Sequence, residues 1–519
     1  MPKKSLLTAC LWALFASCLW SAELTGVVYE DVNANGVRDE GEPGISGVAV
    51  NTAQGVEMTD EDGNYTLNWI GMGKLIVWVR VPAEYTVARD KMTNVPQFYK
   101  VFYSESDNAF LKTNEPGESV DFALLKRPAS ESGDAFKMLV LSDPQVGDTH
   151  QVELYREDIL CELVGTDAEF AVCLGDFGGG PKFIRNIADA TGMLGIPVYG
   201  AIGNHDRVET TDNRDSFDDG FNAVYGPSDY SFDRGKAHFI VLSTTYFTGK
   251  GSGYKEGLTE EQLSWVKQDL ESVPAEKLIV FMSHCPLYDR KGVPQLNIDK
   301  LLALLDGRKV MSFAGHWHTN SRMDLITSEN ATTTGPREFV QQVCPVACGS
   351  FWCGPADLRG IPVSDQPDGT PNGYTIWQFD GDKMPVGRYK AASLPESYQM
   401  RILTPDLLGG GYYWNGNGML VNYFMGYDKS KVEYRLNGGE WIAMTRKEMV
   451  DPETEQLIDG VAAHRWVPTL WVEPSKHIWF TDTLVGLKTG MNTVLIRATE
   501  PDGRVIEQGR IFRGYKKAD

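Results

Sequence analysis

Residues 196–206 read IPVYGAIGNHD, and this stretch decides the fold of the middle of the chain. An apolar run long enough for a short buried strand ends in an amide, an imidazole and a carboxylate, which offer little to a core. The same pattern recurs in FKMLVLSD, FAVCLGD, LIVFMSH and VMSFAGH. Amphipathic helical patterns separate several of these runs, for example in residues 259–273, TEEQLSWVKQDLESV. The alternation predicts an α/β sheet whose polar groups gather at the strand ends.

The polar strand ends form one constellation of nine residues. They are Asp143, Gln145, Asp176, Asn204, His205, Asp206, His284, His316 and His318. A single Asp or His at a strand end is usually a cap, but five such ends in one segment fit a two-metal hydrolytic site. Because adjacent parallel strands end at one edge of a sheet, we expect these side chains to converge. Imidazoles and carboxylates without a thiolate favour Zn, Mn or Fe.

Residues 136–320 resemble the calcineurin-like metallophosphoesterase family. The family pattern of D-x-H, GD, GNHD/E, a single His and GHxH stands here as DPQ, GD, GNHD, SHCP and GHWH. The flanking segments are similar to the extra N- and C-terminal β-domains of an exported bacterial branch of that family. The resemblance implies a central α/β sandwich between two β-sandwiches. It also implies hydrolysis of a phosphomonoester or phosphodiester, in which a metal-bound hydroxide attacks phosphorus in line.

The resemblance assigns a role to each strand-end residue. The first metal would be held by Asp143, Gln145, Asp176 and His318. The second would be held by Asp176, Asn204, His284 and His316, so that Asp176 bridges the two. His205 would either protonate the leaving oxygen or stabilise the transition state, and Asp206 would orient its imidazole and favour the protonated form. Gln145 stands where the family usually has histidine, and its neutral amide oxygen should make the first site harder and weaker.

The segments on either side of the central segment have a different sequence pattern. The sequence pattern predicts three domains. They are an N-terminal β-sandwich in residues 23–126, the phosphoesterase domain in residues 136–384, which has a Gly/Pro-rich loop region from residue 321, and a C-terminal β-sandwich in residues 385–519. The stretch DVNANGVRDEGE fits the spacing of a twelve-residue calcium loop. Its ligand positions are Asp31, Asn33, Asn35, Asp39 and Glu42. A structural calcium site and a plain acidic turn both remain open.

The N-terminus and the overall charge bear on location and partners. Residues 1–22 have a basic start and a short apolar stretch, which predicts a signal peptide and an exported, periplasmic or outer-surface protein. Cleavage after Ala22 or before Cys18 remains open, and the latter would add a lipid anchor. No later segment is long and apolar enough for a transmembrane helix. The formal charge of −21 argues against a nucleic-acid-binding patch.

Several features leave alternatives open. CPVACGSFWC, residues 344–353, could hold one disulfide. The substrate is expected to be a small-molecule, lipid or sugar phosphoester. Phe351, Trp352, Tyr246 and Tyr254 either contact its leaving group or pack within loops. A competing hypothesis is a non-catalytic surface binding or adhesion protein that keeps the phosphoesterase domain as a scaffold, but apart from Gln145 no ligand is lost.

Overall fold

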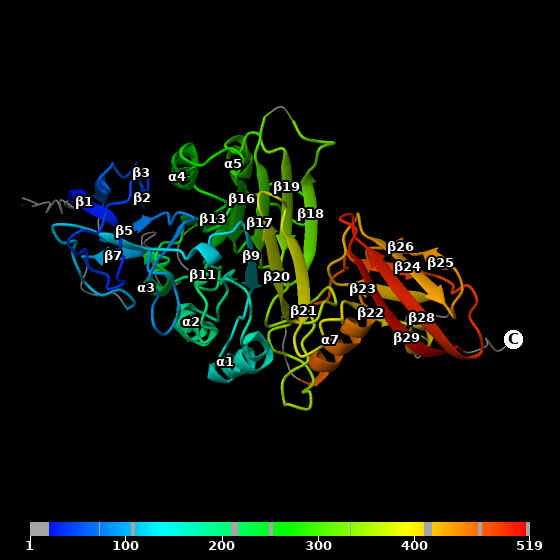
Figure 1. The fold of residues 1–519 in the computed structure, drawn as a ribbon. Coiled ribbons are helices and arrows are strands. Elements are labelled where there is room, and N and C mark those ends of the chain that lie inside the picture. Colours follow the sequence, from blue (N-terminus) through cyan, green and yellow to red (C-terminus); the bar gives the residue numbers. More distant parts are fainter. Residues whose placement is uncertain are drawn as a thin grey trace, which may run out of the picture.

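The computed structural model describes residues 20–71, 73–104, 109–208, 216–248, 253–332, 334–408, 418–464 and 470–514. The predicted signal peptide therefore lies largely outside the described residues. The predicted fold class is confirmed, since a central α/β sandwich lies between an N-terminal and a C-terminal β-domain (Figure 1). In Figure 1 the N-terminal domain is blue, the central sheets run from teal through green to yellow, and the C-terminal domain is orange and red. In the part of the chain that the structure describes, no helix has both the length and the apolar character needed to span a membrane.

The N-terminal domain consists of two four-stranded sheets, in the orders β4-β1-β8-β6 and β3-β2-β5-β7. Their strands are β1 (Trp20–Glu30), β2 (Ala49–Thr52), β3 (Gly55–Met58), β4 (Asn64–Gly71), β5 (Lys74–Val79), β6 (Tyr85–Thr86), β7 (Tyr99–Tyr103) and β8 (Phe122–Lys126). The domain is fixed to the central sandwich by buried polar contacts. The Arg80 guanidinium lies 3.1 Å from the Asp269 carboxylate, and the indole N–H of Trp265 donates to Asn51 at 3.1 Å.

Two sheets face each other in the central sandwich. The first has the order β11-β10-β9-β20-β21 and the second the order β12-β13-β16-β17-β19-β18. The first comprises β9 (Ala135–Leu141), β10 (Phe170–Cys173), β11 (Val198–Gly200), β20 (Gly373–Asp380) and β21 (Val386–Ala391). The second comprises β12 (Tyr230–Arg234), β13 (Ala237–Leu242), β16 (Leu278–Ser283), β17 (Lys309–Ala314), β18 (Ser321–Ile326) and β19 (Glu338–Val343). Neighbouring strands are parallel within β9 to β11, and within β13, β16, β17 and β19.

Both faces of β9 are buried from Met138 to Leu141, which explains why this part of the strand is continuously apolar. Met138 and Val140 belong to the core shared with the second sheet, whereas Leu139 and Leu141 pack with α1 (Thr149–Tyr155) and α2 (Ile184–Gly192). The short helix α3 (Asp219–Tyr225) follows near α2. Helices α4 (Glu260–Glu271) and α5 (Ile298–Ala303) accompany the second sheet (Figure 1). Thr259 begins α4 with a capping box, which satisfies the first amides of the helix.

The arrangement differs from the expectation in two respects. The motif-bearing strands do not share one sheet edge: β9, β10 and β11 end on one sheet, and β16 and β17 end on the other. Residues 321–384 are also not a loop region alone, because they contain β18, β19 and β20. The strand β21 lies beyond residue 384, where we expected the C-terminal domain to begin, and pairs with β20. These segments form strands because they pair with strands that are distant in the sequence, although glycines and prolines are frequent nearby.

The C-terminal domain is a second pair of four-stranded sheets, in the orders β22-β23-β27-β26 and β25-β24-β28-β29. Its elements are β22 (Met400–Leu403), α6 (Pro405–Leu408), β23 (Met419–Tyr423), β24 (Lys431–Leu436), β25 (Trp441–Ala443), β26 (Thr445–Arg446), α7 (Pro452–His464), β27 (Ile478–Thr481), β28 (Gly490–Thr499) and β29 (Val505–Gly514). The buried imidazole of His477 lies 3.0 Å from the Asp368 carboxylate, in the DGTPNGY loop of the central domain. This contact holds the two domains together.

Candidate metal centre

The strand-end residues have a strained backbone. Positive φ angles occur at Asp143 (44°), Gln145 (40°), Asp176 (52°), His316 (71°) and His318 (54°). Such a conformation costs about 1–3 kcal/mol for a residue with a side chain, and it persists where the surroundings enforce it. Its concentration at residues predicted to be ligands marks the strand ends as a functional site.

Glycines precede Asn204 and His316 because the chain is crowded there. A Cβ atom at Gly203 would lie 2.2 Å from the Oδ1 atom of Asp176. A Cβ atom at Gly315 would lie 2.2 Å from the Oδ2 atom of Asp143. Both distances are well below van der Waals contact, so only glycine allows each loop to pass beside a carboxylate. The glycines of GNHD and GHWH therefore make room for the carboxylates of the neighbouring strands.

One group of predicted ligands gathers around Asp143. The Nε2 atom of His318 lies 3.6 Å from the Oδ1 atom of Asp143, and the Gln145 amide nitrogen lies 3.4 Å from the Oδ2 atom of Asp176. The Nδ1 atom of His318 is 3.0 Å from the carbonyl oxygen of Gly349. A hydrogen bond from Nδ1 to that carbonyl leaves Nε2 as the acceptor nitrogen that faces the carboxylate. The structure thus brings together the four residues predicted for the first metal.

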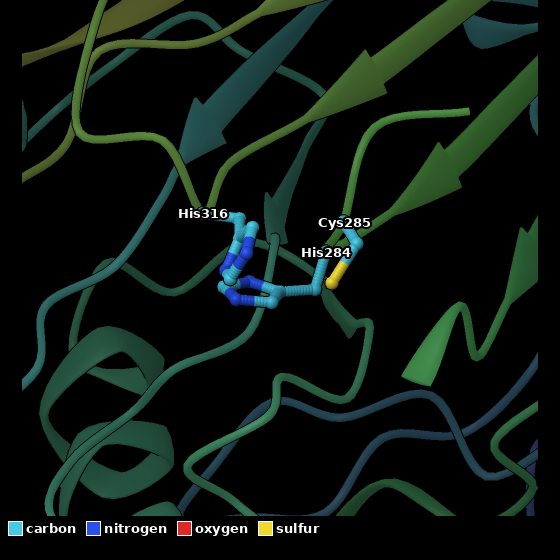
Figure 2. A group of neighbouring side chains, drawn as sticks. All are labelled: His284, Cys285 and His316. Carbon is cyan, nitrogen blue, oxygen red and sulfur yellow. The ribbon is translucent and has the colours of Figure 1, made fainter. Parts of the chain in front are cut away.

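A second group gathers around His284. Its Nε2 atom lies 3.2 Å from the Oδ2 atom of Asp176 and 3.0 Å from the Oδ1 atom of Asn204. Its Nδ1 atom faces the carbonyl oxygen of Leu174 at 2.8 Å, which orients the ring. The imidazole of His316 lies beside that of His284, with ring centroids 5.0 Å apart (Figure 2). Asp176 contacts members of both groups.

The donor set fits divalent cations. Ligand atoms of Asp143, Asp176 and His284 all lie within 4.8 Å of one another, and all three side chains are buried. Burial raises the pKa of Asp176, but His284 and His205 outweigh burial and hold it well below its usual range. Burial lowers the pKa of His284, but Asp176 and Asp143 outweigh burial and raise it to about 10. Two buried carboxylates that attract positive charge this strongly, with imidazole and amide donors beside them, match the ligands of Zn, Mn or Fe.

The expected role of Asp206 does not agree with its contacts. Its carboxylate is fully buried and accepts hydrogen bonds from the backbone amides of Gly203 (2.7 Å), Asp176 (2.8 Å) and Phe177 (2.8 Å). The side chain of His205 is exposed instead, and its backbone N–H donates to Asp176 at 2.9 Å. Asp206 therefore ties the GD loop to the GNHD loop, and its role in orienting His205 stays a prediction that these contacts do not support.

Besides Trp471, which is described below, four neighbours of the centre were missed by the sequence analysis. Glu256 on β15 (Tyr254–Glu256), which pairs with β14 (Thr245–Phe247), lies 3.4 Å from the Nε2 atom of His316. Two buried thiols also lie beside the centre. The thiol of Cys285 is within 4.8 Å of ligand atoms of His284 and His316 (Figure 2), and that of Cys348 is 3.8 Å from the Nδ1 atom of His318. Arg207 donates from Nε to the Asn204 carbonyl oxygen at 2.5 Å. Arg207 and Cys285 had a local signal, because they directly follow GNHD and the histidine of SHCP.

Of the four aromatic residues predicted near the substrate, Phe351 and Tyr254 lie beside the metal-centre histidines, whereas Trp352 and Tyr246 do not. The ring of Phe351 lies 4.8 Å from that of His318, and the ring of Tyr254 lies 6.4 Å from that of His316. Trp352 is buried and donates to the Pro144 carbonyl oxygen at 2.7 Å, so it packs beneath the centre. Tyr246 lines a separate pocket of about 450 Å³ between the N-terminal domain and α4. Trp471 of the C-terminal domain, which the sequence analysis missed, lies 6.1 Å from His318 between ring centroids.

The acidic N-terminal loop closes on itself. Asp31 accepts from the amides of Asn35 (3.1 Å) and Gly36 (2.8 Å), and Glu42 accepts from the amides of Val32 (2.9 Å) and Asp39 (3.0 Å). The two remaining candidate side chains donate to the Asp39 carboxylate. They are Asn33 at 2.6 Å and Asn35 at 2.8 Å. The five candidate calcium ligands therefore share one compact loop.

No disulfide joins the cysteines of the described part of the chain. All six remain free thiols, including Cys344, Cys348 and Cys353 of CPVACGSFWC. The bridge that the sequence allowed is therefore absent, and two of these three thiols are buried beside the metal centre and the first sheet.

Models of protein families match three parts of the chain. The model of the calcineurin-like phosphoesterase family matches residues 136–320, that of the C-terminal domain of calcineurin-like phosphoesterases matches 343–505, and that of the SdrD B-like domain matches 22–110. No curated protein matches. The solved structure of a purple acid phosphatase from yellow lupin (Lupinus luteus) seeds has a TM-score of 0.34 and 12% identity, covering 72% of this chain and 67% of that one.

A second solved structure, phosphopantetheinyl hydrolase from Mycobacterium tuberculosis, has a TM-score of 0.26 and 13% identity, covering 40% of this chain and 89% of that one. The two phosphoesterase models together span about two thirds of the chain. Their match carries both the motif-bearing sandwich and the domain that follows it. The chain therefore contains a calcineurin-like phosphoesterase domain in residues 136–320, followed in residues 343–505 by a match to the C-terminal domain of that family of metal-dependent phosphate-ester hydrolases.

Proposed function

We propose that this protein is an exported phosphoesterase that hydrolyses a phosphomonoester or phosphodiester at a dinuclear metal centre. The observation that carries the proposal is the convergence of all seven predicted ligands on two groups that share Asp176. Export, to the periplasm or the outer surface, rests on the basic and apolar N-terminus. Lipidation at Cys18 would in addition anchor the exported chain to a membrane.

Two sets of side chains are available for the two ions. One set is Asp143, Gln145, Asp176 and His318, and the other is Asp176, Asn204, His284 and His316. Two divalent ions held there would supply Lewis-acid charge to the phosphoryl oxygens and lower the pKa of water. The buried carbonyl contacts of His284 and His318 hold each imidazole in the tautomer whose Nε2 atom can accept a metal.

His205 would act on the leaving group. Its backbone is tied to Asp176 through the amide, whereas its side chain is exposed to solvent. From there it can donate a proton to the oxygen that departs from phosphorus. Asp206 and the glycines of GNHD keep this loop in register with the GD loop.

The acidic loop between β1 and β2 has a separate, structural role in the proposal. Asp31, Asn33, Asn35, Asp39 and Glu42 would hold one calcium ion, far along the chain from the hydrolytic centre. Calcium there would rigidify the N-terminal domain without taking part in hydrolysis.

The proposal is tested by metal content and turnover on a panel of phosphomonoesters and phosphodiesters. We expect close to two transition-metal ions per chain, and Asp176→Asn should lower both occupancies because the carboxylate is shared. His205→Ala should keep both metals. Its rate should fall by about 10²–10⁴ for alkyl esters and much less for nitrophenyl esters, whose leaving group departs without a proton. No turnover by the metal-loaded protein on any ester would refute the function, and loss of one ion alone in Asp176→Asn would refute the bridge.

A further inference from the structure

A tryptophan of the C-terminal domain, Trp471, lies beside the metal centre. Trp471 lies in the segment 470–475, which leads towards β27. Its ring centroid is 6.1 Å from that of His318 and 6.0 Å from that of Phe351. The Phe351 ring is itself 4.8 Å from the His318 ring. Phe351 and Trp471, from two domains, thus form an aromatic wall beside the GHWH loop.

The segment that carries Trp471 is held firmly against that loop. The backbone N–H of Glu473 donates to the Pro367 carbonyl oxygen at 3.0 Å, and its carboxylate pairs with the Arg290 guanidinium. Arg290 lies over the Trp317 ring at 4.7 Å and donates to the Trp317 carbonyl oxygen at 3.1 Å. Since Trp317 stands between the two histidines of GHWH, these contacts fix Trp471 relative to the metal ligands.

Packing alone does not account for the aromatic wall. Trp471 keeps 38% of its surface exposed, whereas Trp352 nearby is 2% exposed. Leaving a large indole in water forfeits the gain that burial would provide. Phe351 and the buried Trp352 both have a positive φ, 56° and 55°, so the turn that presents Phe351 beside His318 is strained as a whole. An exposed indole and a strained phenylalanine beside a catalytic centre are typical of a binding surface.

The chemistry of the wall limits what it can bind. Two rings favour a flat partner that stacks on a face or packs against an edge. The nearest cation among the contacts described above is Arg290, and Glu473 already pairs with it, so the wall has no strong preference for an anionic group. The wall adjoins His318, so the group that it contacts belongs to the ester bound at the centre.

We propose that Phe351 and Trp471 bind a planar aromatic leaving group, such as an aryl or nucleobase-bearing alcohol, so that the C-terminal domain selects the substrate. This inference rests on the proposed phosphoesterase function and names its substrate class. Trp471 is a specificity residue: it contacts the part of the ester that departs and takes no part in bond cleavage.

The direct test is binding of two stable phosphonates to the metal-loaded full chain, measured by isothermal titration calorimetry. Wild type should bind phenylphosphonate about tenfold more tightly than methylphosphonate, the preference expected of one ring pair. Trp471→Ala should abolish the preference by weakening phenylphosphonate alone, and Trp471→Phe should keep most of it. Trp441→Ala is the matched control, because that indole lies in the outer sheet of the same domain under Arg497.

A kinetic test uses phenyl phosphate and an alkyl phosphate. Trp471→Ala should raise KM for phenyl phosphate about tenfold with kcat nearly unchanged, and should leave the alkyl ester unaffected. Equal affinity of wild type for the two phosphonates, or an equal loss for both in Trp471→Ala, overturns the aromatic wall. If the phosphonate preference and its loss are observed but no ester is hydrolysed, the proposed function fails and the binding surface stands.

Discussion

Replacing Asp206 by asparagine tests the role that the structure gives this residue. Its Oδ2 atom accepts the amides of Gly203 and Asp176 at 2.7 and 2.8 Å, and its Oδ1 atom accepts that of Phe177 at 2.8 Å. The carboxamide of Asp206→Asn has only one oxygen. If that oxygen keeps the two amides at the first position, the NH₂ group faces the N–H of Phe177. One buried donor without an acceptor costs about 1–3 kcal/mol.

The assay is equilibrium unfolding in urea with EDTA present, so that lost metal binding does not contribute to the difference. The free energy of unfolding of the central domain should fall by about 1–3 kcal/mol in Asp206→Asn, and further in Asp206→Ala, which leaves three amides without an acceptor. His205→Ala is the control: its side chain is exposed, and its stability should match wild type. If Asp206→Asn is as stable as wild type and loses only turnover of alkyl esters, Asp206 acts through His205 and the structural role is refuted.

Three further predictions concern other parts of the molecule. Gln145→His should tighten the first site for zinc, because nitrogen binds that ion better than an amide oxygen; metal titration that finds equal or weaker affinity would remove Gln145 from the ligands. Calcium should raise the melting temperature of the full chain relative to EGTA, and Asp31→Ala should abolish the rise; a wild type that melts identically in both makes the loop an ordinary turn. Arg80→Ala should destabilise the fold by about 3–5 kcal/mol in urea, since it leaves the buried Asp269 carboxylate without that partner; a change below about 1 kcal/mol would mean that His238 alone balances it.

The sequence by itself determined the elements that carry the chemistry. An apolar run followed by a polar end is a local pattern, so the strands before Asp143, Asp176, Asn204, His284 and His316 could be recognised without knowing how they pack. The glycine that precedes several of these residues is equally local in the sequence, although its reason, the close approach of a carboxylate, is visible only in space.

The tertiary structure alone decided how those ends meet. The ligands come together between two facing sheets and not at the edge of one sheet. Each sheet also pairs strands that are far apart in the chain, such as β20 with β9 and β19 with β17. The partners of Asp206 are amides of its own and a neighbouring loop, and no residue pattern distinguishes an amide-binding carboxylate from one that orients an imidazole. Trp471 reaches His318 from another domain. Such contacts depend on how whole domains pack, and a contact between distant residues leaves no periodic signal in the sequence.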